Sequence, residues 1–255
     1  MDNGSAITAG RYASMIGFEA FEPTGLYQYS FAYDAHILTA PILGGIGDVT
    51  IIPGYANGIK YTVESDTTFF GISLQDEAFG FDNGRLGGDG ASSYAIEVAG
   101  SMAFDNGISW FIGGAYEDND GAAGDSYMLN SYVTFETGAW IFAGELNIGE
   151  SKGDVFALGS VFGGGQDEEV LQGLLMANFA YSDAASITGR ISYVNHEYDV
   201  VELDGTKLTL AHGYAFTDNL FLVTELSYAD GEVSVPGLGI EGDSLLAAVE
   251  LIFSF

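Results

Sequence analysis

The chain contains no cysteine, only 4 prolines, and 6 Lys and Arg residues against 36 Asp and Glu residues. The absence of cysteine fits a periplasm-exposed protein without disulfides. The shortage of basic residues argues against a nucleic-acid partner, because phosphate binding needs clustered Lys and Arg. No apolar run approaches the roughly 18–20 residues that a transmembrane helix requires. The formal net charge of −30 serves either solubility or the attraction of cations.

The N-terminus, Met-Asp-Asn-Gly-Ser, has neither the charged region nor the apolar region of a signal peptide. For a secreted protein, we therefore expect a chain that is mature, re-engineered or truncated.

What the sequence does contain indicates a β-protein: 37 glycines, 15 tyrosines and 18 phenylalanines. Its last strand, 243–255, alternates between two kinds of side chain. Leu245, Val249 and Phe253 lie on a uniformly apolar face, whereas Glu250 and Ser254 lie on the other. This alternation recurs along the chain in segments of about ten residues, the length of a tilted strand that crosses a bilayer. The pattern predicts an all-β fold, a transmembrane antiparallel barrel of about twelve strands in one domain, 1–255.

The connections between these strands alternate in length, as they do in outer-membrane barrels with short periplasmic turns and long external loops. The predicted long loops lie near residues 76–91, 117–125, 149–169, 197–206 and 230–243. Acidic residues concentrate in them, so we expect a negative external rim. Aromatic residues near the strand ends, including Trp110, Trp140 and Tyr214, are expected at the membrane interface.

Residues 14–56 interrupt the pattern. Residues 26–33 alternate, but counting them as a wall strand gives thirteen strands. Treating 14–56 as one long loop gives twelve, the even number that single-chain bacterial barrels have. We therefore predict one long loop over 14–56.

The stretch 10–20, followed by 26–33 and by Asn57-Gly-Ile-Lys-Tyr-Thr62, resembles the trimeric bacterial porins. In that family a strand ends in Gly-Arg, a loop then folds into the pore, and a Gly-Val/Ile-x-Tyr strand follows. The terminal Phe255 is similar to the family's signal for the barrel-assembly machinery. The family has sixteen strands with the loop after the fifth, whereas the matching strand comes first here. The resemblance thus implies either a fragment of a sixteen-stranded porin or a smaller relative.

The resemblance also implies that 14–56 is an infolded constriction loop, in which acids face basic residues on the wall with a transverse field between them. The candidate loop acids are Glu19, Glu22, Asp34 and Asp48, and the candidate wall bases are Arg11, Lys60, Arg190 and Lys207. The alternative is that these are merely solvated residues of the lumen. Further acids are predicted to face the lumen and to give a weak preference for cations: Glu64, Glu97, Glu136, Glu145, Glu225 and Glu250.

The sequence therefore predicts a porin of the bacterial outer membrane that lets small hydrophilic solutes or ions diffuse passively. Its expected partners are membrane lipid and, from the resemblance, two further copies in a homotrimer. No cofactor, metal or catalytic residue is predicted. Two alternatives stay open. One is a phospholipase-like outer-membrane enzyme, for which His212 is the candidate histidine, and the other is an acidic, secreted, soluble β-protein.

Overall fold

The computed structural model describes residues 4–19, 26–38, 46–79, 93–119, 124–152 and 167–254. No helix that could cross a membrane occurs in these ranges. The strands are β1 (Ser5–Ala13), β2 (Asp34–Leu38), β3 (Ile46–Asp48), β4 (Tyr55–Glu64), β5 (Thr68–Gln75), β6 (Ser93–Ala103), β7 (Ile108–Asn119), β8 (Ser126–Thr137), β9 (Trp140–Ser151), β10 (Glu168–Ser182), β11 (Ala185–Tyr198), β12 (Glu202–Thr217), β13 (Leu220–Val235) and β14 (Leu238–Phe253).

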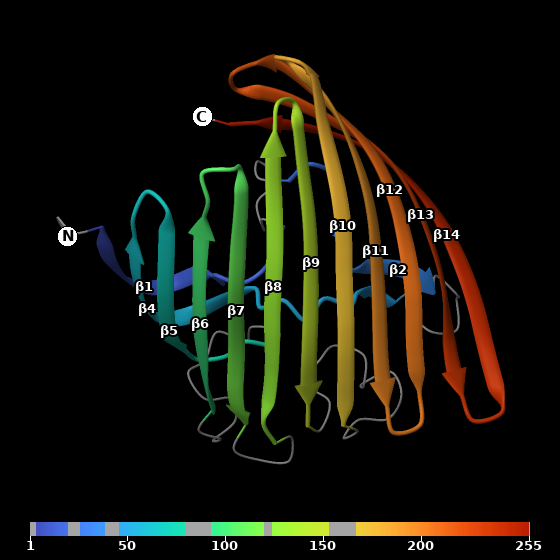
Figure 1. Cartoon of the computed structure of the whole chain (residues 1–255). Coiled ribbons are helices and arrows are strands. Elements are labelled where there is room, and N and C mark those ends of the chain that lie inside the picture. The colour runs from blue at the N-terminus through green and yellow to red at the C-terminus, as the bar shows by residue number, and fades with distance from the viewer. Residues whose placement is uncertain are drawn as a thin grey trace.

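Twelve of these strands form one antiparallel sheet in the order β1-β4-β5 and onward to β14, so the predicted all-β fold and number of strands are confirmed. Figure 1 shows the sheet as a curved wall. β1 and β14 form its two edges and do not pair with each other in the described residues. β1 pairs directly with β4, so the described residues between them, which were predicted to form a loop, contribute no strand to the wall. In this pair Ile7 lies opposite Tyr61.

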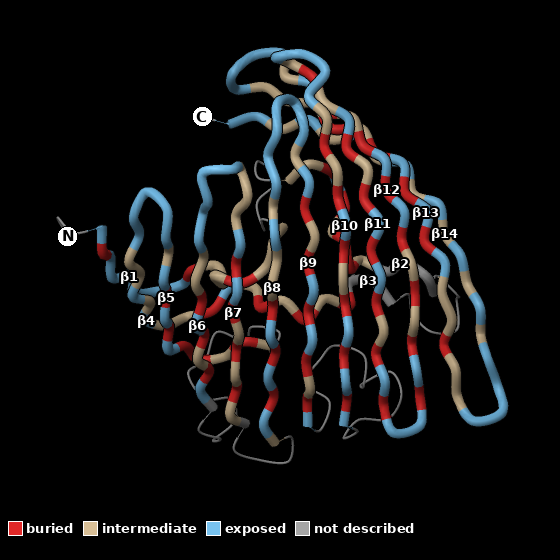
Figure 2. Tube along the Cα trace, in the orientation of Figure 1, coloured by how far each residue is buried: buried red, intermediate tan, exposed pale blue. Residues whose placement is uncertain are grey.

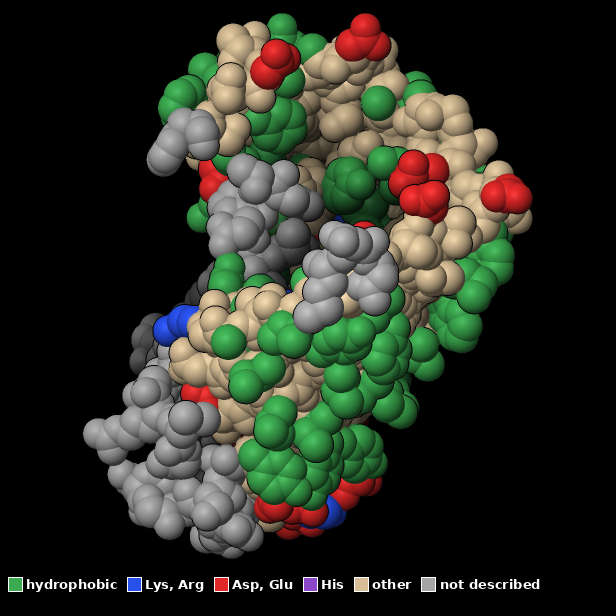
Figure 3. Space-filling model, turned by 90° about the vertical axis from the view of Figure 1, so that its left-hand side faces the viewer, with side chains coloured by type: hydrophobic (Ala, Val, Ile, Leu, Met, Phe, Trp, Pro, Cys, Tyr) green, Lys and Arg blue, Asp and Glu red, His purple; other side chains and the backbone are tan. Residues whose placement is uncertain are grey.

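The alternation of side chains divides the wall into an outer and an inner face (Figure 2). On the outer face, large apolar side chains stay exposed, such as Leu175 at 65% and Leu245 at 70%. On the inner face, the intervening residues are buried, as in β10 and β11. Figure 3 shows the hydrophobic side chains gathered over a broad area of the surface, with acidic side chains beyond it. Such an exposed apolar surface is stable in lipid rather than in water.

Two of the predicted long loops, 197–206 and 230–243, are wrong. β11 and β12 are joined by three residues, and β13 continues to Val235 before a Pro236-Gly237 turn. Gly237 has φ = 86°, which suits the left-handed position of such a turn. The acidic residues in these ranges, which led to the prediction of loops, lie in strands. Glu232 of β13, for example, lies opposite Glu241 of β14. A strand of 16 residues spans roughly 53 Å, so these strands project beyond a hydrocarbon layer about 30 Å thick.

Within 14–56, a short hairpin of β2 and β3 was not predicted. It pairs at Asp34 with Asp48 and at Leu38 with Ile46, and its strand β2 lies against β12, β13 and β14. The described residues around it, 14–19, 26–34 and 49–54, are here called the infolded segment. They pack on the inner face, where Val49 joins an apolar cluster with Val194 and Leu203, and Ile51 joins another with Met128. The core therefore lies between the wall and this segment.

Candidate functional site

The first part of the infolded segment is attached to the wall by carboxylates that accept backbone hydrogen bonds. The Met15 N–H donates to Glu97 Oε2 of β6 (N···O 3.2 Å), and the Phe18 N–H donates to Glu145 Oε1 of β9 (2.7 Å). Glu145 also accepts from the Tyr33 hydroxyl (2.8 Å), so it joins two parts of the segment. Both glutamates are buried. Irregular backbone at membrane depth needs such partners because it lacks a regular ladder of hydrogen bonds.

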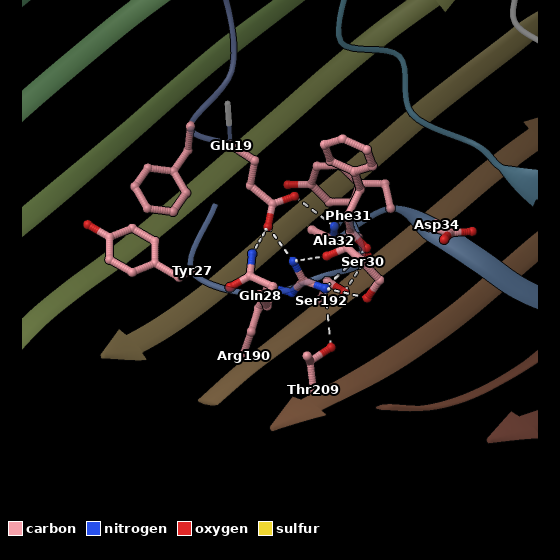
Figure 4. Close-up of polar contacts among 12 residues, drawn as sticks. Glu19, Tyr27, Gln28, Ser30, Phe31, Ala32, Asp34, Arg190, Ser192 and Thr209 are labelled. Atoms are coloured by element: carbon pink, nitrogen blue, oxygen red, sulfur yellow. Dashed lines mark hydrogen bonds and ion pairs between the residues drawn. The ribbon is translucent and has the colours of Figure 1, made fainter. Parts of the chain in front are cut away.

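Glu19 and Arg190 of β11 form an ion pair on the inner face (Figure 4). Their side chains are 7% and 0% exposed. Arg190 Nη1 also donates to the Ser30 carbonyl (2.9 Å), and Nη2 donates to the Phe31 carbonyl (3.1 Å). Glu19 Oε2 accepts from the Ala32 N–H (2.7 Å). The pair thus ties one part of the infolded segment to another and both to the wall.

Two further charged side chains bind the same stretch. Glu225 Oε2 of β13 accepts from the backbone N–H groups of Tyr29 (2.8 Å) and Ser30 (2.9 Å). Lys207 Nζ of β12 donates to the carbonyls of Phe31 (3.1 Å) and Asp34 (3.2 Å). Wall acids therefore satisfy backbone donors, and wall bases satisfy backbone acceptors.

The last part of the infolded segment, Val49–Gly54, is here called the return limb. Gln172 Nε2 of β10 donates to the Val49 carbonyl (2.6 Å), and Gln172 Oε1 accepts from the Ile51 N–H (3.4 Å). The Gly54 carbonyl accepts from the Ser14 N–H (2.8 Å). Both ends of the segment are thus held at defined places on the inner face.

The structure brings together four of the residues singled out for the constriction. Glu19, Asp34 and Arg190 lie near one another in Figure 4, and Lys207 donates to the Asp34 carbonyl. Lys60 also lies on the inner face, where Nζ is 4.6 Å from the centre of the Tyr12 ring and donates to the Ala13 carbonyl.

Arg11 differs from the expectation that it faces inward. Its guanidinium lies over the ring of Tyr55, 5.9 Å from the centroid, and Tyr55 is exposed. The adjacent Tyr12 is buried and takes the inner position beside Lys60. Because successive side chains of a strand point to opposite faces, Arg11 is directed outward.

The six predicted lumen acids fall into two groups. Glu97, Glu145 and Glu225 are buried and bonded to the infolded segment. Glu64 and Glu136 are exposed at the turn ends of β4 and β8, and Glu250 is partly exposed on β14. Glu22, Phe255 and the side chain of Asp48 lie outside the described residues.

The sequence analysis did not single out a buried polar group formed by Glu168, Gln172, His196 and Tyr198. His196 Nδ1 lies 2.6 Å from Glu168 Oε1, which also accepts from the Tyr198 hydroxyl (2.6 Å). His196 Nε2 lies 3.1 Å from Gln172 Nε2. All four alternate onto the inner face of β10 and β11, so the period of two could have placed them there.

His212, the candidate histidine of a phospholipase-like enzyme, lies on the outer face of β12. Its Nε2 is 2.6 Å from the Tyr181 hydroxyl. The residues directly opposite it on the neighbouring strands are Ile187 and Thr224. In the described ranges, no group of three or more acidic, His or Cys side chains is arranged to hold a metal ion.

The C-terminal end of β9 carries an exposed ion-pair group. Lys152 binds Glu150 and Asp167, with Nζ 3.0 Å from Asp167 Oδ2. The hydrogen bond from Lys152, followed by that from Tyr127, lowers the pKa of Glu150 below its usual value. Because these side chains are exposed, the pairs contribute little to stability.

Residues 47–255 match the model of a protein family described as beta-barrel porin-2, OmpL-like. The chain belongs to this porin family. Its members are proteins of the bacterial outer membrane, which agrees with the apolar outer face and the polar inner face described above. Among curated proteins, none matches the chain at a significant level.

Solved structures show the same fold at low sequence identity. OmpT of Vibrio cholerae is 13% identical with a TM-score of 0.65, over 99% of this porin and 78% of that chain. The outer membrane channel DcaP of Acinetobacter baumannii is 10% identical with a TM-score of 0.60, over 98% and 71%. A further porin is 15% identical with a TM-score of 0.54, over 86% and 72%.

Proposed function

We propose that this porin lets small hydrophilic solutes and ions cross the outer membrane by passive diffusion, with a preference for cations, and that it has no enzymatic activity. The observation that carries the proposal is the infolded segment, which is fixed on the polar inner face of a transmembrane wall by Arg190, Glu225 and Lys207. A fixed segment inside a barrel narrows the path of solutes without a chemical step. Membership of the porin family supports the channel, and the charges of the inner face support the preference for cations.

The preference for cations follows from which charges remain available to a solute. Arg190 and Lys207 are buried and donate to the backbone of the infolded segment. Glu64 and Glu136 stay exposed, and Glu250 stays partly exposed. Among the described residues, Lys60 is then the base of the inner face that is not buried. Acids that reach water in a narrow passage attract cations and repel anions.

The test is to insert the purified protein in planar bilayers and to measure the reversal potential in a gradient of KCl. We expect discrete conductance steps and a K⁺ to Cl⁻ permeability ratio above one. Lys60→Gln should raise that ratio further. Lys152→Gln is the matched control, because it removes the same charge from the external rim. A ratio at or below one refutes the preference for cations, and repeated insertions without conductance refute the channel.

We also propose a homotrimer. The structural relative OmpT of Vibrio cholerae is described in a trimer form, and it is 13% identical to this porin with a TM-score of 0.59. Native mass measurement of the protein in mild detergent tests this proposal, and a mass of one chain at all protein concentrations contradicts it.

A further inference from the structure

We propose that His196 and Gln172 form a proton-sensitive latch that holds the return limb against the wall and weakens when His196 becomes protonated. The two side chains lie next to each other on β10 and β11, with a distance of 3.1 Å between Gln172 Nε2 and His196 Nε2. Both are fully buried. Gln172 is the side chain that contacts both His196 and the backbone of Val49 and Ile51.

The contacts of Gln172 with the backbone fix the direction of its hydrogen bond to His196. The Val49 carbonyl is an acceptor, so it must face the amide nitrogen of Gln172, and the Ile51 N–H must face the amide oxygen. The amide nitrogen therefore also faces His196 and donates its second hydrogen to Nε2. A ring nitrogen that accepts carries no proton, so the latched state requires neutral His196 with its proton on Nδ1, donated to Glu168.

Protonation of His196 breaks this arrangement. Nε2 then becomes a donor and faces the amide nitrogen of Gln172, which is also a donor. A rotation of the Gln172 side-chain amide by 180° restores the hydrogen bond to His196. It also places the amide nitrogen against the Ile51 N–H and the amide oxygen against the Val49 carbonyl. Either orientation leaves like groups in contact. The protonated state therefore loses the contacts that attach the return limb to β10.

Glu168 is the charged group that faces His196. Glu168 is fully buried, and its Oε2 has no hydrogen-bond partner among the described residues. A cationic imidazole beside this carboxylate offsets the cost of burying it. Tyr198 is the other titratable group bonded here. The strand neighbours are neutral: β9 places Ser151 opposite Glu168 and Asn147 opposite Gln172, and β12 places Leu203 opposite His196.

The release is partial, because Val49 and Ile51 remain packed in their apolar clusters. Imidazoles change charge between about pH 5 and 8. We expect the population of a released return limb to rise about tenfold between pH 7.5 and pH 5.0, the effect of losing one or two net hydrogen bonds.

A spin label on the return limb tests the latch directly. The chain has no cysteine, so Gly54→Cys gives a single attachment site. No atom lies within 4 Å of a Cβ placed at Gly54, so the substitution fits without strain. In the refolded protein, label mobility should increase at pH 5.0. Added to the labelled chain, His196→Gln should stay immobile at both pH values, because glutamine is neutral. Gln172→Leu should be mobile at both.

His212→Gln is the matched control, because that histidine lies on the outer face and should leave the response to pH unchanged. The proposal is overturned if label mobility does not change with pH, if His196→Gln responds as the parent does, or if Gln172→Leu behaves as the parent. The label reports the position of the limb without ion flow. A protein that responds to pH but does not conduct therefore refutes the proposed function and leaves the latch intact.

Discussion

Replacing Arg190 with methionine should destabilise the porin strongly, because the substitution keeps the approximate size of the side chain and removes every contact of its guanidinium. Glu19, whose side chain is 7% exposed, would then be a buried carboxylate without its cation. Removing one partner of a buried ion pair costs about 3–5 kcal/mol. The carbonyls of Ser30 and Phe31 lose their donors as well, so we expect the upper part of that range.

The reverse substitution, Glu19→Gln, should cost less, about 1–2 kcal/mol. Arg190 keeps four acceptors in that variant: the two carbonyls, Ser30 Oγ at 3.5 Å and Thr209 Oγ1 at 3.2 Å. The double variant should then be more stable than the sum of the two single losses predicts, with a coupling energy of at least about 2 kcal/mol. Urea unfolding of protein refolded in vesicles measures these values, and the native residues Trp110 and Trp140 give the fluorescence signal.

A coupling energy below about 0.5 kcal/mol would refute the reasoning, because it would show that the two residues act independently. In that case Glu19 reaches water in the folded protein, and the ion pair does not fix the infolded segment.

Two further predictions concern the infolded segment and the end of β12 that projects beyond the membrane. Gly17 has φ = 107°, and an added Cβ would lie 2.9 Å from Ile52 Cγ2, so Gly17→Ala should lower the unfolding free energy by at least about 1–2 kcal/mol. Gly189→Ala, where the site is open, should be nearly neutral. Burial, with repulsion from Glu202, Glu232 and Asp230, raises the pKa of Asp204. Stability from this group therefore falls as pH rises through that pKa, and Asp204→Asn should raise the urea midpoint at pH 7.5 but not at pH 3; an equal gain at both contradicts this.

The fold could be predicted from the sequence because strand side chains repeat every two residues. The alternation around Leu245 and Leu175 assigns the outer face correctly. The same rule failed for Arg11, because the motif Gly10-Arg11-Tyr12 does not show which of two neighbouring side chains is directed inward. Composition misled the loop assignment near Glu232, since acidic residues occur both in loops and in strands that project into water. An acidic loop and an acidic strand end differ in how far the strand extends beyond the membrane, and the sequence does not show this.

The contacts of the infolded segment could not be predicted for a different reason: they join side chains to backbone groups. Glu225 was identified as a lumen acid, but its partners are the N–H groups of Tyr29 and Ser30, which any residue carries. Likewise, the contacts of Gln172 with Val49 and Ile51 depend on the path of the chain and not on residue type. The pattern of side chains in the sequence therefore does not predict such contacts.

The excess of acids on the inner face therefore has two separate origins. An irregular segment inside a barrel presents both N–H groups and carbonyls that need partners. Carboxylates such as Glu97 and Glu145 satisfy the N–H groups, and Arg190 and Lys207 satisfy the carbonyls. The polar atoms of these buried groups are bonded within the protein, and Arg190 is also paired with Glu19. Among the described residues, the exposed acids do not bind the segment, so under the proposed function the charges that position the segment and the charges that select ions belong to different residues.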